Sequence, residues 1–146
     1  MMKNFNIRVY GILINESGFV LASDEIIHGK EITKFPGGGL EFGEGTIDCL
    51  KREFIEELGQ SIEVVKHFYT TDFFQPSAFN KDNQVISIYY LVKLIDKPKF
   101  KTTSLQFDFE SKIEGAQSFR WIPLQTITES DFTFPIDKKV AGMLKK

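Results

Sequence analysis

The stretch GGGLEFGEGTIDCLKREFIEELGQ, residues 37–60, places a dense set of carboxylates directly behind three glycines, in a chain whose net charge is only −2. Six acidic side chains lie within 17 residues: Glu41, Glu44, Asp48, Glu53, Glu56 and Glu57. Carboxylates this close repel one another unless a positive group lies among them. The stretch therefore predicts a site that gathers a cation.

The second half of this stretch, residues 46–58, is predicted to be an α-helix. Its apolar residues recur at spacings of three, four and four and define one face: Ile47, Leu50, Phe54 and Leu58. Thr46 can cap its first turn, and Gly59 can end it in a left-handed conformation. Cys49 lies toward the inner side of this helix and is interpreted as a small core residue.

Three glutamates share one edge of the predicted helix. At about 100° per residue, Glu53, Glu56 and Glu57 fall within an arc about 100° wide beside the apolar face. Clustered carboxylate oxygens suit a hard divalent cation such as Mg²⁺. Arg52, four residues before Glu56, supplies a fixed positive charge that can orient a glutamate or balance the cluster without metal.

The glycine segment ahead of the helix is interpreted as a turn. Its carbonyls can ligate a metal, and its amides can approach a phosphate closely because glycine carries no side chain. A divalent cation, a phosphate-binding turn and an edge of carboxylates together favour hydrolysis at phosphorus, since a bound metal lowers the pKa of an attacking water.

The spacing of these residues resembles the Nudix box of the Nudix hydrolases, G-x5-E-x7-R-E-U-x-E-E-x-G-U, where U is a bulky aliphatic residue. From Gly38 to Gln60 all seven fixed Gly, Glu and Arg positions match, over 23 of the 146 residues. Phe54 and Gln60 depart from aliphatic positions. The flanking segments KFPGGG and FRWIPL (residues 119–124) also look like the family, and the chain length fits its MutT-like branch.

The resemblance implies an α+β fold, the Nudix α/β/α sandwich with a mixed β-sheet and flanking helices, in a single domain over residues 1–146. It implies hydrolysis, dependent on Mg²⁺ or Mn²⁺, of a nucleoside diphosphate linked to a group X, to give a nucleotide plus phosphorylated X. The implied metal ligands are Glu53, Glu56, Glu57 and the Gly37 carbonyl. Arg52 would orient the glutamates. Glu44 would hold the loop and assist through water.

Other site residues stay open at this point. The general base differs between branches of the family, and it is either a box glutamate or a carboxylate in a later loop, here Glu110 or Glu114. Gly38 and Gly39 are expected to bind substrate phosphate. Pro76 lies sixteen residues beyond the box, which is a marker of ADP-ribose pyrophosphatases. Phe74, in a loop after a strand, could stack on a nucleobase.

Several substrates and functions remain as alternatives. ADP-ribose or another nucleotide sugar, a nucleoside triphosphate and a dinucleoside polyphosphate are all candidate substrates. A non-catalytic Nudix-fold sensor would have lost box glutamates, which this chain keeps. A solvated acidic helix would bind Mg²⁺ no better than scattered carboxylates. An isoprenoid diphosphate isomerase would need a catalytic cysteine outside the box, and the only cysteine is Cys49.

Composition sets the remaining expectations. The weakly acidic balance argues against a nucleic-acid or membrane-surface binder. One cysteine and no long apolar run predict a cytoplasmic protein. The phenylalanine-rich loop and strands could supply a homodimer interface. His28 and His67 are expected to be structural or surface residues, and Trp121 and most phenylalanines to lie in the core.

Outside the box, alternation and β-branched residues predict strands at residues 7–14, 19–22, 62–71, 85–95, 105–109 and 118–122. Residues 28–33 and 108–115 are predicted to be loops. A helix is expected over residues 135–145. Its inward face is expected to consist of Ile136, Val140, Met143 and Leu144.

Overall fold

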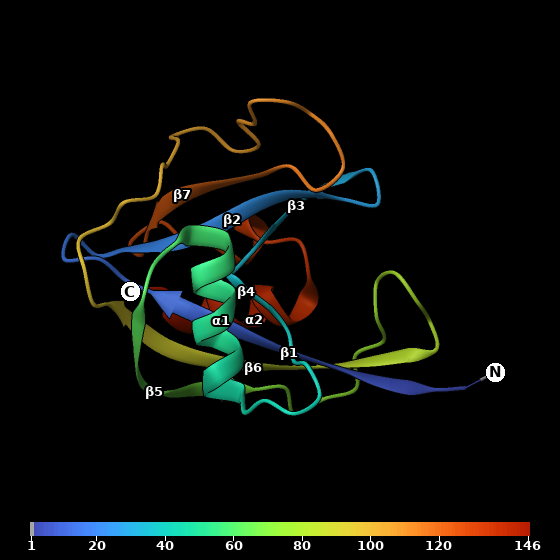
Figure 1. Cartoon of the computed structure of the whole chain (residues 1–146). Helices are drawn as coiled ribbons and strands as arrows, with labels where there is room; N and C mark the ends of the chain where they lie inside the picture. Colours follow the sequence, from blue (N-terminus) through green and yellow to red (C-terminus); the bar gives the residue numbers. More distant parts are fainter. Residues whose placement is uncertain (1) are drawn as a thin grey trace. The chain divides into compact units, whose positions relative to one another are not determined.

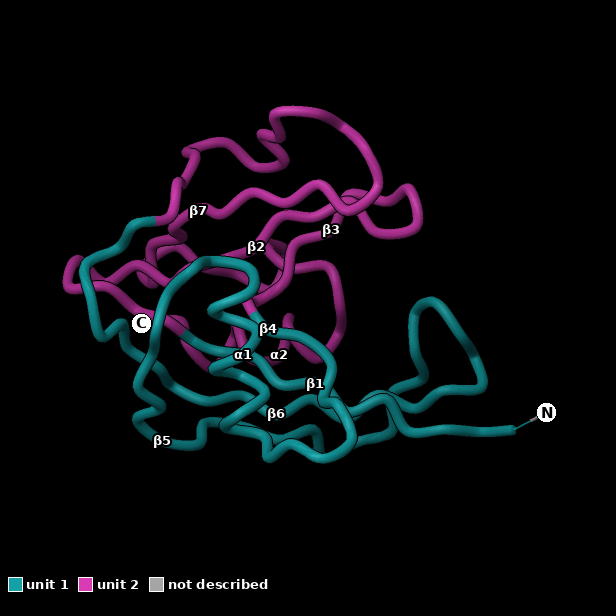
Figure 2. Tube along the Cα trace, in the orientation of Figure 1, with its two compact units in different colours: residues 1–12, 37–99 teal, residues 13–36, 100–146 magenta. Residues whose placement is uncertain are grey.

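The computed structural model describes residues 2–146, and their secondary structure is mixed α and β (Figure 1). The chain forms two compact units, one from residues 1–12 and 37–99 and one from residues 13–36 and 100–146 (Figure 2). Each unit has its own sheet and its own α-helix. No helix among the described residues is long and apolar enough to cross a membrane.

The sheet of the first unit has the strand order β4-β1-β6-β5. The strands are β1 (Asn4–Leu13), β4 (Gly37–Gly39), β5 (Ile62–Thr70) and β6 (Asn83–Leu94). The pairs β4–β1 and β5–β6 are antiparallel. Figure 1 shows β1 and β6 running in the same direction, so the sheet is mixed, as expected. The predicted strands near residues 7–14, 62–71 and 85–95 are confirmed.

Helix α1 (Thr46–Leu58) has the predicted bounds. Gly59 ends it with φ 65°, and its N–H is 3.0 Å from the carbonyl oxygen of Ile55. The residue at the N-cap is Gly45, without a side-chain hydrogen bond, so the prediction that Thr46 caps the helix is wrong. The Thr46 hydroxyl instead lies 2.6 Å from the Tyr90 hydroxyl.

The buried face of α1 differs from the prediction in its first turn. Leu50, Phe54 and Leu58 are buried, and so is Cys49, as expected. Ile47 is 42% exposed. Residues four apart lie on the same face of a helix, so the buried face that contains Leu50 continues to Thr46 in the first turn. Thr46 contacts the sheet through Tyr90. Ile47 is therefore turned toward solvent.

The sheet of the second unit has the order β3-β2-β7, with all pairs antiparallel. It consists of β2 (Phe19–Ile27), β3 (Lys30–Lys34) and β7 (Gln117–Pro123). The prediction of a loop over residues 28–33 is wrong from Lys30 onward, where β3 begins. His28 and Gly29, with φ of 51° and 73°, reverse the chain in two residues, and Ile27 then pairs with Lys30.

The expected strand at residues 105–109 is not formed. Leu105 is 67% exposed, and Phe107 has a left-handed backbone with φ 59°, which no strand accommodates. The Phe107 N–H instead donates to Asp24 at 3.2 Å, and Asp24 also accepts hydrogen bonds from Arg120 at 2.7 Å and Thr33 at 2.6 Å. The buried carboxylate of Asp24 thus holds the segment 105–109 in place without the hydrogen bonds of a β-sheet.

The second unit ends in a 3-10 helix η1 (Glu129–Asp131) and in α2 (Pro135–Leu144). On α2, Ile136, Val140 and Leu144 are buried as predicted, whereas Met143 is 47% exposed. The core uses fewer phenylalanines than expected. Of fifteen, those that are buried are Phe35, Phe54, Phe119 and Phe132. Trp121 is half-buried, and His28 and His67 are exposed.

Candidate active site

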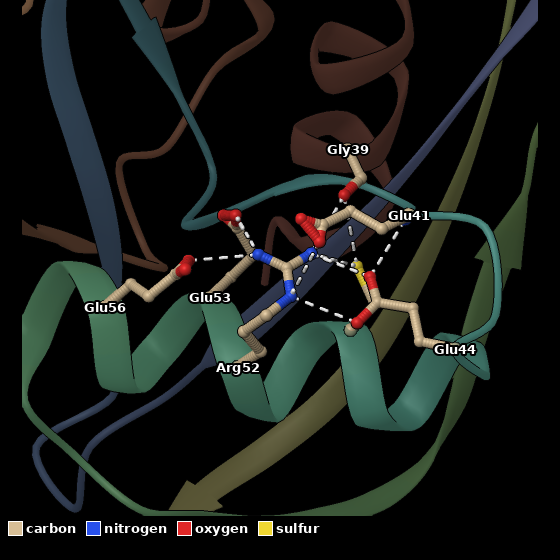
Figure 3. A network of polar contacts seen from close by, with 7 residues as sticks. Gly39, Glu41, Glu44, Arg52, Glu53 and Glu56 are labelled. Atoms are coloured by element: carbon tan, nitrogen blue, oxygen red, sulfur yellow. Dashed lines mark hydrogen bonds and ion pairs between the residues drawn. The ribbon is translucent and has the colours of Figure 1, made fainter.

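The guanidinium of Arg52, on α1, is the centre of a carboxylate cluster in the first unit (Figure 3). Glu44, in the loop between β4 and α1, binds it with both oxygens. The Nε atom of Arg52 lies 3.0 Å from one oxygen of Glu44, and an Nη atom lies 2.7 Å from the other. This two-point geometry is the strongest that an arginine and a carboxylate can form.

The other side of the same guanidinium holds two glutamates of the helix. One Nη atom lies 3.1 Å from Glu53 and 3.0 Å from Glu56. The second Nη atom donates to the Gly39 carbonyl at 3.1 Å, and Glu41 forms a longer ion pair at 3.7 Å. Four carboxylates therefore surround one cation, and the cluster keeps an excess of negative charge.

The ion pair between Arg52 and Glu44 also determines the protonation state of Glu44. Hydrogen bonds from Arg52, then the N–H of Glu41 at 2.9 Å, lower the pKa of Glu44 to about 2. The same pairing raises the pKa of Arg52 above its ordinary value. Glu44 is thus ionised at neutral pH and ties the loop to the helix. That geometry suits the loop-holding role expected from the resemblance.

The three glycines form the strand β4 and not the turn that was expected. Gly37, Gly38 and Gly39 pair with Tyr10, Val9 and Arg8 of β1. Gly38 lies against the carboxylate of Glu53. A Cβ atom at this position would be 2.6 Å from Cδ of Glu53, which is far inside van der Waals contact. The absence of a side chain at residue 38 is what permits Glu53 to reach the strand.

The donor set suits a divalent cation, although no three His, Cys, Asp or Glu side chains converge as a ready metal site among residues 2–146. Glu53 and Glu56 bring hard oxygen atoms to a common nitrogen of Arg52, and Glu57 follows on the same helix, half-buried. Glu56 is 56% exposed and Glu53 is 15% exposed. Carboxylate oxygens of this kind are the ligands that a hard divalent cation binds.

Two other predicted site residues of the first unit lie in the loop between β5 and β6. Phe74 is 71% exposed. Pro76 forms an isolated bridge with Gln84, which ties the loop to the start of β6. Their roles in binding substrate stay predictions.

The two loop carboxylates considered as general bases belong to the second unit. Glu110 is exposed and lies 3.5 Å from Lys101. Glu114 accepts the backbone N–H of His28 at 2.7 Å and of Gly29 at 2.9 Å, and these bonds lower its pKa. A general base works best with a pKa near the operating pH. Glu114 is therefore better suited to hold the turn between β2 and β3 than to accept a proton.

Sequence reasoning did not single out Arg8 and Tyr10, which lie beside the glycine strand. The Nε atom of Arg8 donates to the Tyr10 hydroxyl at 2.6 Å. The register that pairs Arg8 with Gly39 brings them to this place. Arg8 and Tyr10 could have been identified only if the pairing of β1 with the glycine segment had been known. That pairing was not predictable, because three glycines in a row do not predict a strand.

Comparisons with known proteins concern the fold and the family of the chain. The model of the NUDIX domain family matches residues 4–141. No curated protein matches the sequence. Three solved structures that share the fold illustrate its range.

A MutT protein from Methanosarcina mazei Go1 is 19% identical, with a TM-score of 0.71 over 99% of this chain and 95% of that one. A NUDIX hydrolase from Nitrosomonas europaea is 19% identical, with a TM-score of 0.69 over 95% and 86%. An ADP-ribose pyrophosphatase from Streptococcus suis 89-1591 is 16% identical, with a TM-score of 0.61 over 95% and 86%.

Proposed function

Since this chain belongs to the NUDIX family and is a hydrolase that acts on phosphoric anhydride bonds, we propose that it cleaves a nucleoside diphosphate linked to a group X. The products would be a nucleotide and phosphorylated X, and Mg²⁺ or Mn²⁺ would be required. The observation that carries the proposal is the cluster in which Arg52 gathers Glu44, Glu53 and Glu56 beside β4.

Each residue of the cluster has a proposed role that follows from its position. Glu53, Glu56 and Glu57 would hold the metal, with the Gly37 carbonyl as a further ligand. When bound, the cation would polarise a phosphoryl oxygen and lower the pKa of a water. Arg52 orients Glu53 and Glu56 through one nitrogen. Holding reacting groups in place supplies much of the rate in such reactions.

Two further residues shape the site. Glu44, fixed on Arg52, keeps the loop between β4 and α1 closed against the helix. Gly38 leaves the space that the carboxylate of Glu53 occupies. A box glutamate is the base we favour, because Glu114 is held as a carboxylate by two backbone N–H groups. Glu110 remains the candidate among the later loops.

The identity of X rests on fewer observations. One structure of similar fold is described as a MutT protein and another as an ADP-ribose pyrophosphatase. We propose a nucleotide sugar such as ADP-ribose or a nucleoside triphosphate as the two candidate substrates. Phe74, which is 71% exposed, would stack on the base, and Pro76 would position its loop. Gly38 and Gly39 would approach the phosphates.

A panel assay tests this proposal. The pure protein is incubated with Mg²⁺ or Mn²⁺ and with nucleoside triphosphates, ADP-ribose, nucleotide sugars and dinucleoside polyphosphates, and the products are resolved by chromatography. Cleavage of one class at a pyrophosphate link, abolished by chelation, supports the proposal and names X. If nothing is cleaved while a nucleotide still binds, the chain is a sensor module of the same fold.

The proposal extends to the location and the oligomeric state of the protein. A cytoplasmic location agrees with the single buried cysteine, because a reducing compartment keeps it free. A homodimer would cover exposed aromatic residues of the loop between β5 and β6 other than Phe74, such as Phe79. Light scattering that gives a monomer at high protein concentration would dismiss the dimer.

A further inference from the structure

We propose that Gly11, on β1, is a positioning residue for the glutamates of α1. The ring of Phe54 lies directly over Gly11, and this contact would set how closely the middle of α1 approaches the sheet of the first unit. Phe54 follows Glu53 on the helix, so Gly11 would act through its neighbour and touch neither substrate nor metal. This role rests on the proposed function, because it concerns the placement of the same carboxylates.

The space above Gly11 is filled by one aromatic ring. A Cβ atom built at Gly11 would lie 2.6 Å from Cε1 and 2.8 Å from Cζ of Phe54, and 3.3 Å from a methyl carbon of Val92 on β6. Ordinary carbon contacts are about 3.5–4.0 Å, so the first two distances describe overlap. Gly11 does not have a positive φ. The position therefore requires the lack of a side chain and not an unusual backbone.

The ring of Phe54 has little freedom to move away from an added methyl group. Its side chain is 1% exposed, and Val92 beside it is also buried. Buried side chains are close-packed, so a displacement is passed on to the atoms around them. A methyl group at Gly11 would therefore push the backbone of α1 away from β1 by roughly 1 Å, which restores an ordinary contact distance.

Gly11 lies on the same face of the sheet as the contact between Gly38 and Glu53. Val9 pairs with Gly38, and residues two apart on a strand point to the same face. Two successive residues of the helix are thus each placed against a glycine, Glu53 on β4 and Phe54 on β1. A shift of α1 at Phe54 would therefore also move the carboxylate of Glu53 relative to β4.

Two further contacts describe how α1 would move. At the start of the helix, the hydroxyl of Thr46 lies 2.6 Å from that of Tyr90 on β6, which holds the first turn on the sheet. In the middle, Arg52 donates to the Gly39 carbonyl of β4 at 3.1 Å, and this hydrogen bond would be lost if the two groups separated by about 1 Å. The second half of the helix, which carries the three glutamates, would be displaced most.

Phe54 is also a position at which this chain departs from the aliphatic residue of the box. Leucine has no atoms that correspond to Cε1 and Cζ of phenylalanine, and these are the two atoms that an added methyl group at Gly11 would overlap. Gly11 and Phe54 are therefore matched in size, and a leucine at residue 54 should tolerate an alanine at residue 11. A double substitution can test this coupling.

The test compares G11A, F54L and G11A/F54L with the wild type on the substrate identified in the panel. Two controls are matched to these changes. G142A adds the same methyl group where the nearest atom is 3.6 Å away, and F132L shortens a buried ring of the second unit, alone and combined with G11A. Steady-state kinetics give kcat and KM. Electron paramagnetic resonance follows Mn²⁺ binding without substrate, and thermal melting monitors the fold.

We expect G11A to fold with a Tm lowered by about 2–12 °C, because overpacking strains the core. Its kcat should fall roughly a hundredfold, as a misplacement near 1 Å can cause, with KM changed less than about threefold. Its affinity for Mn²⁺ should fall roughly tenfold to a hundredfold.

The double variant should reverse these losses. G11A/F54L should recover kcat and Mn²⁺ affinity to within about tenfold of the wild type, although its Tm stays lower, because the overlapping atoms are gone. F54L alone leaves a cavity and no overlap, so its Tm should fall more clearly than its kcat. G11A/F132L should stay as impaired as G11A, while G142A and F132L should keep the kcat of the wild type.

The outcomes separate the two proposals. A wild-type protein that cleaves nothing overturns the proposed function and this inference with it. An active wild type, with unchanged kcat and Mn²⁺ affinity in folded G11A, overturns the inference alone. A G11A/F54L protein that is as impaired as G11A, or that does not fold, also overturns it. If G11A itself does not fold, G11A/F54L decides, and recovery of turnover there supports the role of Gly11.

Discussion

Replacing Gly38 by alanine should displace the carboxylate of Glu53 and slow turnover, while the stability of the fold changes little. A Cβ at residue 38 would lie 2.6 Å from Cδ and 2.7 Å from Oε1 of Glu53. Because ordinary carbon contacts are about 3.5–4.0 Å, the carboxylate must withdraw by roughly 1 Å. A misplacement of that size at a catalytic group costs about a hundredfold in rate, or roughly 2.7 kcal/mol in activation free energy.

The free energy of unfolding should change much less in G38A. The group that must move is the far end of a side chain, and Gly38 does not have a positive φ. Weakening the ion pair between Arg52 and Glu53 costs up to about 1 kcal/mol of stability. Replacing glycine by alanine stabilises the fold by about 0.4–1 kcal/mol, because it lowers the conformational entropy of the unfolded chain. The expected net change is therefore within about 1 kcal/mol.

Neighbouring glycines supply the controls. G37A should destabilise the fold by about 2–6 kcal/mol, because Gly37 has φ 145° and a Cβ there would overlap the backbone carbonyl of Val9. G142A, in α2, meets no atom nearer than 3.6 Å and should leave turnover unchanged. Denaturant unfolding and turnover are measured on each. A G38A protein with wild-type turnover and metal affinity would refute the reasoning.

The remaining predictions concern protonation and the glutamates. Folding lowers the pKa of Glu44 from 4.5 to about 2, so the stability it contributes is present above about pH 4.5 and is lost as pH falls toward 2. Denaturant unfolding between pH 6 and 3 should show a shallower fall in E44Q, and equal slopes would contradict the assignment. Burial raises the pKa of the Cys49 thiol to about 12, so a disulfide reagent at about pH 8 should label it only after unfolding. Rapid labelling of the native protein would count against the buried position. E56Q and E57Q should fold normally and lose roughly two orders of magnitude or more in turnover, and normal activity in both would remove the metal assignment.

The central helix and the longer strands could be predicted because their information is local. α1 follows from apolar spacing and from Gly59, and β5 and β6 follow from β-branched and aromatic residues. The contact between Arg52 and Glu56 also follows from helical spacing, since a separation of four residues brings both side chains to one side of the helix.

What the sequence did not reveal depends on partners far along the chain. Residues 105–109 alternate as a strand would, yet the N–H of Phe107 is satisfied by Asp24, 83 residues away. β3 looks like a polar loop because four of its five side chains are polar, and two of these, Thr33 and Lys34, are buried against partners on β2. Gly37–Gly39 becomes a strand only through its pairing with β1.

The interleaving of the two units has a consequence for synthesis on the ribosome. Every residue of the first unit, including the carboxylate cluster, has been translated by residue 99. β2 and β3 are made early, yet β2 must wait for β7 at residues 117–123, and Asp24 must wait for Arg120. Nascent chains released before this point would carry a complete first unit and an open sheet edge. Such intermediates are the species that invite misassociation.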